Sequence, residues 1–368
     1  MSVPFYNFND LHTPEFKAEL FERFSKIYDT NGFVEGEYNA SFESRFAQMQ
    51  EAKHCLLVAN GTDALEIALE AHGVGQGDKV GVPGITFYAT AEAVLNRGAI
   101  PVWIDIETES GLICPESTQR VIEQHKLKAI MPVHIYGMAA DMEKINSICE
   151  QHNVAIIEDA AQAQGAFFEN GKPIGSTHNL TTFSFYPTKN LSAFGDAGAI
   201  LTQSDELALK IKTIRNHGRS ELDMLGRNSR CDHMQAAVLD LKLERIEEYN
   251  KMRKAVAKHY HTTLKAAELP VTLLSDRHLE TSSWHLYPIR VANSEIREKL
   301  QAHLQKHEIG CTPFYDQAMH QMKVLKNFKE GETKKAEELA GRSICLPMNP
   351  FLKEEDIQKV TSTIKAFF

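Results

Sequence analysis

A lysine at position 189 stands in a setting that suits covalent chemistry with a carbonyl compound. The run FSFYPTKNL at 183–191 places Lys189 just beyond an apolar segment, and the glycine-rich turn FGDAG follows at 194–198. An ammonium group in a partly desolvated pocket loses its proton more readily, which leaves an amine able to attack an aldehyde. A single lysine is far more often a solvated surface residue, so this hypothesis needs a partner elsewhere in the chain.

An acidic pair thirty residues upstream supplies that partner. Glu158 and Asp159 open the run EDAAQA directly after the apolar residues 154–157. Two carboxylates at the carboxyl end of a buried strand are costly unless something there uses them. The alternative is that both acids face solvent in a loop. The combination of Asp159 with Lys189 favours a site for Schiff-base chemistry.

Two glycine-containing segments are candidates for phosphate binding. Gly61-Thr62-Asp63 follows the apolar stretch 55–58 and begins a helical pattern, which places backbone N–H groups and a hydroxyl at a helix N-terminus. The alternative is that Thr62 is an ordinary helix cap. The glycines of GVGQGDKV at 73–80 precede a strand instead of following one, so they do not fit a dinucleotide-binding motif and indicate a turn.

The elements that must position these residues alternate along the chain. Short apolar runs predict buried strands at 79–82, 100–105, 129–134, 154–159, 181–186 and 199–202. Helical patterns lie at 62–71, 86–96, 115–125 and 142–152. This alternation predicts an α/β fold with a mostly parallel sheet flanked by helices, and ligands bind beyond the carboxyl ends of such strands.

The remaining sequence predicts a second, smaller domain. Residues 232–266 lack Pro and Gly and predict one long helix that connects the domains. A strand is expected at 285–291 and helices at 294–307 and 354–366, which indicates a small C-terminal α/β domain. We therefore predict a large domain at 1–245, with its N-terminal segment, and a small domain at 246–368.

Composition and charge narrow the class of protein. The 368 residues are 43% hydrophobic and carry a net charge of −9, which disfavours a nucleic-acid partner. No apolar run approaches the roughly 20 residues that span a bilayer, and the polar N-terminus does not resemble a secretory signal. The six cysteines show no CxxC spacing, and no His, Cys and Asp cluster has metal-ligand spacing. A cytoplasmic protein without a metal or membrane contact is expected.

The motifs together resemble those of a known family. EDAAQAQGA, FSFYPTKNLSAFGDAGA and RNHG at 215–218 are similar to segments of the DegT/DnrJ/EryC1/StrS sugar aminotransferases, which are fold type I pyridoxal 5'-phosphate (PLP) enzymes. The likeness continues upstream in NGTDAL, PGITFYAT and PVHIYG, and downstream in GRNSR, QAA, HLYP and LPM. It covers nearly the whole chain in the order and spacing of the family.

The resemblance implies a role for each matching residue. Lys189 matches the lysine that binds the cofactor covalently and moves the proton, and Asp159 matches the acid that pairs with the pyridinium nitrogen. Phe87 matches the aromatic residue on the ring face, and Gln162 a residue near the ring oxygen. The phosphate-binding positions are Gly61, Thr62 and Ser184, joined by Asn228 from a neighbouring subunit. The resemblance therefore implies a homodimer with shared active sites.

Four further residues are candidates for substrate binding: Arg230, His285, Tyr315 and His320. The family often shows Tyr-Pro-x-Pro-Leu-His in the small domain, whereas this chain has YDQAMH at 315–320, without the prolines. This departure leaves the path of the loop open. Either Tyr315 and His320 contact the substrate, or they are ordinary loop residues.

The resemblance also implies a reaction. Relatives with histidine in place of the lysine are sugar dehydratases, so Lys189 favours amino transfer from an amino acid, most often glutamate, to a nucleotide-linked keto sugar, with pyridoxamine 5'-phosphate formed during turnover. C4 aminotransferases tend to carry Asn-Tyr-Arg and C3 enzymes Asn-Ser-Arg-Leu-Asp, and this chain has NSRCD at 228–232. We expect a dTDP- or UDP-linked 3-oxo sugar. The alternatives are a C4 aminotransferase and a non-catalytic PLP-binding regulator.

Overall fold

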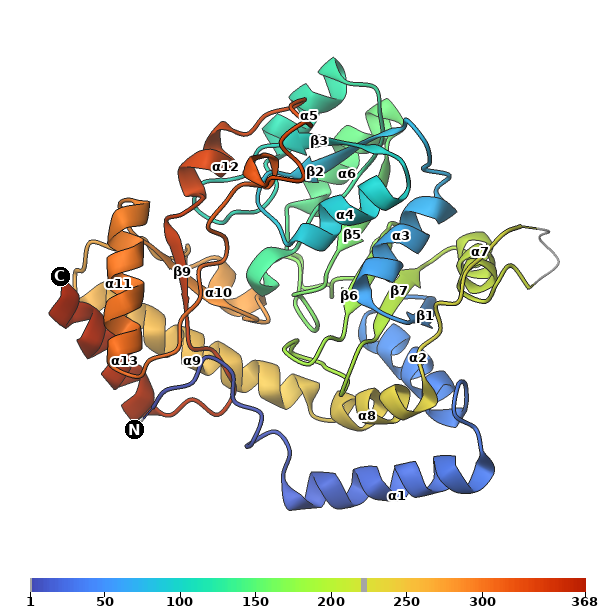
Figure 1. Cartoon of the computed structure of the whole chain (residues 1–368), viewed down its shortest axis with the longest axis horizontal. Coiled ribbons are helices and arrows are strands. Elements are labelled where there is room, and N and C mark those ends of the chain that lie inside the picture. The colour runs from blue at the N-terminus through green and yellow to red at the C-terminus, as the bar shows by residue number, and fades with distance from the viewer. Residues whose placement is uncertain (1, 220–223) are drawn as a thin grey trace.

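The computed structural model describes residues 2–219 and 224–368, which form a seven-stranded sheet and a separate two-stranded sheet, both covered by helices (Figure 1). The strands are β1 (His54–Val58), β2 (Lys79–Pro83), β3 (Ile100–Ile104), β4 (Leu127–Ile130), β5 (Ala155–Asp159), β6 (Leu180–Ser184), β7 (Gly198–Thr202), β8 (Tyr287–Arg290) and β9 (Ser343–Leu346).

The helices fall into those that cover the large sheet and those that surround the small one. They are α1 (Pro14–Thr30), α2 (Glu37–Met49), α3 (Gly61–Ala71), α4 (Tyr88–Asn96), α5 (Pro115–Gln124), α6 (Met142–His152), α7 (Asp205–Arg215), α8 (His233–Leu243), α9 (Ile246–Ala266), α10 (His278–Thr281), α11 (Ser294–Lys306), α12 (Lys334–Leu339) and α13 (Glu354–Phe367), with short 3-10 helices η1 (Ile135–Gly137) and η2 (Met319–Gln321).

The large sheet has the strand order β1-β7-β6-β5-β4-β2-β3. Within this sheet, as described, β7 is antiparallel to its two neighbours, β1 and β6, and the other six strands share one direction. The mostly parallel sheet and its α/β class are confirmed. The carboxyl ends of β1, β2, β4, β5 and β6 therefore meet along one edge of the sheet.

Alternating side chains of the strands form two hydrophobic cores, one on each face of the large sheet. In β1, Cys55 and Leu57 belong to the core covered by α2, α5 and α6, whereas Leu56 and Val58 belong to the core beneath α3, α4 and α7. This two-residue period is what a strand requires, because successive side chains point to opposite faces. Burial on both faces explains why the strands are mostly apolar.

Two of the predicted elements differ from the structure. The single helix predicted over 232–266 is two helices, α8 and α9, which are interrupted at Glu244 and Arg245. The strand predicted over 129–134 begins two residues earlier and ends at Ile130. Beyond Ile130 the regular ladder ends, and contact with β5 continues only as an isolated parallel bridge between Val133 and Asp159.

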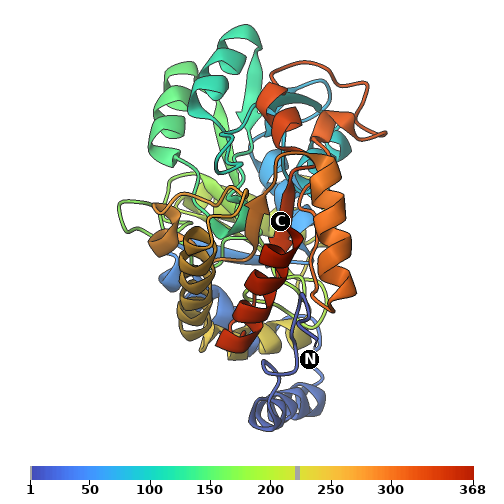
Figure 2. The same ribbon diagram turned by 90° about the vertical axis from the view of Figure 1, so that its left-hand side faces the viewer.

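The small sheet, β8 and β9, lies among α9, α11 and α13 at the left of Figure 1, where the N-terminal segment also runs. From there the chain crosses to α1, which extends away from the body in both views (Figures 1 and 2). Helix α1 contacts the rest of the protein mainly through α8, where Phe16 and Leu20 pack against Val238 and Leu241. Among the described residues, no helix combines the length and the apolar character needed to cross a bilayer.

Candidate active site

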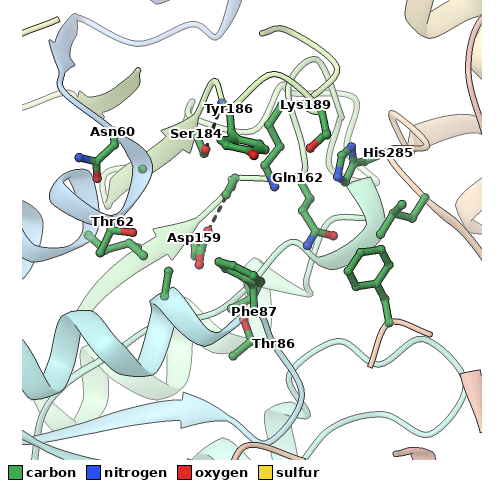
Figure 3. Close-up of a pocket in the computed structure, with 18 of the residues that line it drawn as sticks. Asn60, Thr62, Thr86, Phe87, Asp159, Gln162, Ser184, Tyr186, Lys189 and His285 are labelled. Atoms are coloured by element: carbon green, nitrogen blue, oxygen red, sulfur yellow. Dashed lines mark hydrogen bonds between the residues drawn. The ribbon is translucent and has the colours of Figure 1, made fainter. Parts of the chain in front are cut away.

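A cavity of about 370 Å³ lies at the carboxyl edge of the large sheet. It collects residues from the ends of β1, β2, β4, β5 and β6 and the segments that follow them, and from three places distant in sequence: Tyr6, residues 285–286 and residues 314–315. Its lining includes nine of the predicted site residues: Gly61, Thr62, Phe87, Asp159, Gln162, Ser184, Lys189, His285 and Tyr315. In Figure 3, Asn60, Thr62 and Ser184 lie toward one end and His285 toward the other.

The end of the cavity near β1 is built around the first turn of α3. Asn60 caps this helix, and its side-chain oxygen accepts a hydrogen bond of 2.8 Å from the backbone N–H of Asp63. The cap is therefore Asn60 and not Thr62, the alternative considered above. Thr62 and the first backbone N–H groups of α3 line the cavity, and such groups attract an anion.

Gly61 allows two segments to approach closely at this end. A Cβ atom added to Gly61 would lie 2.6 Å from the Cβ of Ser184, at the end of β6. A Cβ atom on Gly198 would lie 2.4 Å from the backbone oxygen of Asn60. Both positions therefore require glycine, and the contact brings the Ser184 hydroxyl beside the N-terminus of α3.

Asp159, the last residue of β5, is buried and held by two donors. Its Oδ2 accepts a hydrogen bond of 2.8 Å from the Thr90 hydroxyl, and its Oδ1 accepts one of 3.1 Å from the Ala161 N–H. The Thr86 hydroxyl lies 2.8 Å from that of Thr90. Burial raises the pKa of the Asp159 carboxyl, and these hydrogen bonds and the charge of Lys189 partly offset the rise. Thr86 and Thr90 entered the sequence analysis only within the motif PGITFYAT, although their i, i+4 spacing could have indicated a pair.

Glu158, the neighbour of Asp159, has a different role. It points to the opposite face of the sheet and is fully buried, where it accepts hydrogen bonds from His134 Nε2 at 2.8 Å, Thr177 Oγ1 at 2.5 Å and Asn179 Nδ2 at 2.7 Å. His134 Nδ1 accepts from the Ala140 N–H, so Nε2 carries the proton. The alternative that both acids face solvent is wrong, because one is satisfied inside the protein and the other faces the cavity.

Lys189 follows β6 by a short turn, in which its N–H donates to the Tyr186 carbonyl at 2.8 Å. The side chain extends into the cavity from the side opposite Phe87 (Figure 3). Desolvation lowers the pKa of the Lys189 ammonium to about 8, although the nearby charge of Asp159 acts in the other direction. The uncharged amine, which attack on a carbonyl carbon requires, is therefore more accessible near neutral pH than for a solvent-exposed lysine.

Gln162 links the large sheet to the residues that close the cavity. Its Oε1 accepts a hydrogen bond of 2.7 Å from the Tyr136 N–H, and its Nε2 donates to the Tyr315 hydroxyl at 3.1 Å. The Tyr136 hydroxyl donates to the Phe314 carbonyl at 2.6 Å. His285 Nδ1 lies 3.3 Å from Asn190 Oδ1, and burial, Lys189 and Arg253 lower the pKa of its imidazole well below the usual value. His285 is therefore a neutral imidazole beside Lys189.

Three of the predicted residues do not line this cavity. Asn228 pairs with Asn216 in an isolated bridge, and Arg230 Nη1 donates to Asn216 Oδ1 at 3.0 Å. His320 forms an ion-pair contact of 3.0 Å with Glu337 of α12. Their proposed roles in binding stay predictions. Within residues 2–219 and 224–368, no group of three or more His, Cys, Asp and Glu side chains could hold a metal ion.

Comparison with known proteins shows the family. The model of the DegT/DnrJ/EryC1/StrS aminotransferase family matches residues 14–365. The chain belongs to this family. It is a PLP-dependent transaminase, as its residues and the resemblance predicted.

Two relatives and one solved structure illustrate the likeness of this aminotransferase to characterised proteins. It is 38% identical to a pleiotropic regulatory protein of Geobacillus stearothermophilus over 100% of this chain and 99% of that one. It is 35% identical to a UDP-N-acetyl-3-dehydro-α-D-glucosamine 3-aminotransferase of Acidithiobacillus ferrooxidans, over 96% and 95% of the two chains. The crystal structure of S. venezuelae DesV in complex with a ketimine intermediate superimposes with a TM-score of 0.92, at 32% identity over 99% and 98% of the chains.

The cavity of this aminotransferase fits PLP on four independent observations. The close approach of Gly61 to Ser184 and the N-terminus of α3 form a cradle for the phosphate. Asp159 offers a buried carboxylate for the pyridinium nitrogen, Lys189 an amine of lowered pKa for the aldehyde, and Phe87 a 57% exposed aromatic ring that lines the cavity. When bound, PLP carries the amino group and accepts the electrons of the substrate bond that loses its proton.

The residues of the chain then have separate tasks. Asp159 would pair with the ring nitrogen of bound PLP and favour a positive charge there, and the Thr90 hydroxyl orients the Asp159 carboxylate. Lys189 Nζ can take up and release a proton near neutral pH, which suits a general base and acid. Gln162 holds Tyr315 against the cavity, so the distant 314–315 segment restricts access of water to the reacting centre.

Proposed function

We propose that this aminotransferase transfers an amino group from an amino acid, glutamate, to C3 of a dTDP- or UDP-linked 3-oxo sugar. The product would enter cytoplasmic biosynthesis of surface glycans such as the O-antigen of lipopolysaccharide. The observation that carries amino transfer is the presence of Lys189 and Asp159 in one cavity with a phosphate cradle. Nucleotide-sugar aminotransferases among the relatives support the class of acceptor.

The choice of C3 depends on one short sequence segment and on two relatives of the chain. NSRCD at 228–232 is closer to the C3 pattern than to the C4 pattern. The Acidithiobacillus relative acts on a 3-dehydro sugar, and a Streptomyces venezuelae relative, 33% identical over 99% of this chain, is a dTDP-3-amino-3,4,6-trideoxy-α-D-glucose transaminase. The second candidate is a C4 aminotransferase of a nucleotide-linked 4-keto-6-deoxy sugar. A GDP-perosamine synthase of Vibrio cholerae is 32% identical over 90% of this chain, so relatives named for a GDP-linked sugar also occur at this level of identity.

A homodimer with shared sites would complete the cavity. Asn228 and Arg230 do not line the cavity of their own chain, so their expected contacts with phosphate and substrate would be made in the partner's site. Large apolar side chains are exposed on and around α1: Phe21 is 59% exposed and Tyr28 74%, and Phe33 and Val34 are also exposed. A second subunit that covers these side chains would remove this apolar area from water.

The division into domains is part of the proposal. A boundary near residue 245 is supported by the interruption between α8, which packs against α1 and α2, and α9, which packs against α10 and α13. His285 and Tyr315, on the C-terminal side of this boundary, would contact the substrate from the small domain, and His320 would join them if its loop moved inward.

A non-catalytic regulator, the other alternative considered above, is supported only by the name of the Geobacillus relative, a regulatory protein. The two donors that hold the Asp159 carboxylate favour catalysis, because a carboxylate at the ring nitrogen keeps that nitrogen protonated and able to accept electrons, which cofactor binding alone does not require. Mixing the PLP-loaded protein with glutamate distinguishes the two. A transaminase converts the cofactor absorbance to that of the pyridoxamine form and releases 2-oxoglutarate, whereas a regulator leaves the spectrum unchanged.

The acceptor is tested with the protein loaded with pyridoxamine 5'-phosphate. A panel of dTDP- and UDP-linked 3-oxo and 4-oxo sugars is added one at a time, and the return of the pyridoxal absorbance is followed by mass and NMR analysis of the amino sugar. We expect a response to 3-oxo compounds alone. A response confined to 4-oxo compounds would replace C3 by C4 and leave amino transfer intact.

A further inference from the structure

The N-terminal segment of the chain, residues 2–8, reaches the active-site cavity. Tyr6 lines this cavity together with Lys189, although 183 positions separate the two in the sequence. Tyr6 lies before the first residue matched by the family model, residue 14. Asp159, Ser184 and Lys189, which would hold PLP, lie at or just beyond the ends of β5 and β6, so Tyr6 belongs to a different part of the cavity wall.

The position of Tyr6 is fixed by the region around the small sheet. The Val3 N–H donates to the Glu308 carbonyl at 2.9 Å, and the Gly310 N–H donates to the Val3 carbonyl at 2.8 Å, which pairs Val3 in parallel with Ile309. A Cβ atom on Gly310 would lie 2.4 Å from the Phe5 N atom, so the two backbones are in close contact. The segment is therefore an ordered wall of the cavity that ends at Tyr6.

A series of aromatic rings joins Tyr6 to the other residues that close the cavity. The Tyr6 and Phe5 rings meet edge to face with centroids 4.7 Å apart, Phe5 lies 6.4 Å from Phe314, and Phe314 lies 5.3 Å from Tyr315. Tyr315 is bound by Gln162. The cavity thus has a polar end, near Asn60 and Thr62, and an aromatic wall formed by Tyr6, Phe314 and Tyr315.

The Tyr6 hydroxyl adds a polar group to this wall. Burial raises its pKa, and the hydrogen bond with the Thr188 side chain only partly opposes the rise. The phenol is therefore neutral at physiological pH and can both donate and accept a hydrogen bond. Thr188 directly precedes Lys189, so the contact anchors the phenol to the segment that carries the lysine.

An aromatic face combined with a hydroxyl matches the chemistry of a hexose ring. Aromatic rings pack against the C–H faces of sugars, while phenols bond their hydroxyl groups. A free amino acid is smaller and has no such ring. If the proposed function holds, the sugar substrate extends farther from Lys189 than the amino donor does.

We infer that Tyr6 is a specificity-determining residue that contacts the sugar ring of the nucleotide-linked acceptor and does not contact the amino donor. The inference rests on the proposed function. It deepens that function because it assigns recognition of the acceptor to the N-terminal segment. The two half-reactions can be measured separately, so the contribution of Tyr6 to each can be resolved.

The test compares three variants in both half-reactions. Tyr6→Leu removes the ring, Tyr6→Phe removes only the hydroxyl, and Phe8→Leu is the control, because Phe8 belongs to the same segment and stacks near Tyr6 at 6.2 Å but does not line the cavity. Each protein is loaded with cofactor, and its absorption spectrum and melting temperature are recorded first. The glutamate half-reaction and the half-reaction with the sugar that the wild type accepts are then titrated.

The expected result is a selective loss in the sugar half-reaction. Tyr6→Leu should raise the apparent sugar KM by about 10-fold or more. Tyr6→Phe should raise it about 2- to 12-fold, the range for one net hydrogen bond. The glutamate half-reaction, the cofactor spectrum and the Phe8→Leu control should stay within about 2-fold of the wild type.

Several outcomes would overturn the inference. An unchanged sugar KM in Tyr6→Leu would show that Tyr6 does not contact the sugar. Equal losses of activity in the two half-reactions would show that Tyr6 supports the structure of the cavity without selecting the sugar. An equal rise of the sugar KM in Phe8→Leu would show that the effect comes from a disturbed structure of residues 2–8 and not from a contact of Tyr6 with the sugar. If the wild type reacts with glutamate but with no keto sugar, the proposed acceptor is wrong and the inference falls with it.

Discussion

Replacement of Thr90 by valine tests how the chain holds the carboxylate that pairs with the cofactor nitrogen. Valine has nearly the same shape as threonine, so Thr90→Val removes one hydroxyl without opening a cavity. Asp159 would keep the Ala161 N–H on Oδ1 and lose its 2.8 Å donor on Oδ2. Because the site is buried, no water replaces the lost donor at low cost. The pKa of Asp159, already raised by burial, should rise further.

The magnitude follows from the charge of the acceptor. A hydrogen bond to a charged group contributes about 1.5–3 kcal/mol, which corresponds to about 10- to 150-fold in an equilibrium constant. Thr90→Val should weaken PLP affinity by up to this amount, because an Asp159 carboxyl with a higher pKa loses its proton at a greater cost before it pairs with the pyridinium, and the Thr90 hydroxyl no longer orients it. Equilibrium titration of the cofactor-free protein with PLP measures the affinity, and the pH dependence of the cofactor absorbance reports the change at the ring.

Thr86→Val is the matched control. Thr86 is equally buried but lies one hydroxyl farther from the carboxylate, 2.8 Å from Thr90, so its replacement should weaken PLP affinity several-fold less than Thr90→Val does. The reasoning is refuted if Thr90→Val binds PLP within about 2-fold of the wild type with an unchanged pH profile. An effect of Thr86→Val as large as that of Thr90→Val would show that the order of the hydroxyl chain is wrong.

Two further predictions concern the cofactor-free protein and the phosphate cradle. Lys189 has a folded-state pKa of about 8, below its unfolded value of 10.5, so its ammonium destabilises the fold below pH 8 and this penalty fades as pH rises toward 10.5. Lys189→Met should therefore raise the unfolding free energy at pH 7 by about 1–3 kcal/mol, with a gain that shrinks above pH 8 in denaturant titrations; a gain independent of pH would contradict this. Gly61→Ala should lower PLP affinity at least about 10-fold in the same binding titration, because its Cβ would meet that of Ser184 at 2.6 Å, whereas Gly75→Ala, with no atom within 4 Å, should leave it unchanged.

The sequence predicted the elements that are determined locally and missed those determined by distant contacts. β2, β3, β5, β6 and β7 lie within one or two residues of the predicted strands, because strands buried on both faces are mostly apolar. The antiparallel direction of β7 depends on pairing with β1 and β6, which no local pattern encodes. Helix α4 begins at Tyr88 and not at 86, since Thr86 and Phe87 leave the helical conformation to line the cavity.

The same distinction applies to the cavity. Lys189 and Asp159 could be proposed from sequence because each follows an apolar strand, and the carboxyl ends of parallel strands meet. Tyr6 gave no such signal, because it belongs to no predicted strand or helix and depends on the pairing of Val3 with Ile309. The exchange of the expected cap Thr62 for Asn60 has a local cause, since either residue type can cap a helix and only the geometry decides between them.

The cofactor-binding residues and the aromatic wall come from separate parts of the chain, and this separation determines how substitutions affect the active site. The cofactor side depends on close backbone contacts at Gly61 and on buried hydrogen bonds at Asp159, so most substitutions there weaken PLP binding and all activity with it. The aromatic wall is carried by the N-terminal segment and residues 314–315, which are bound to the large domain through Gln162, Tyr136 and Thr188. Side chains on this wall can change size and polarity without disturbing the carboxylate or the lysine. We therefore expect differences in sugar preference between relatives to follow differences at the position of Tyr6 more closely than differences around Lys189.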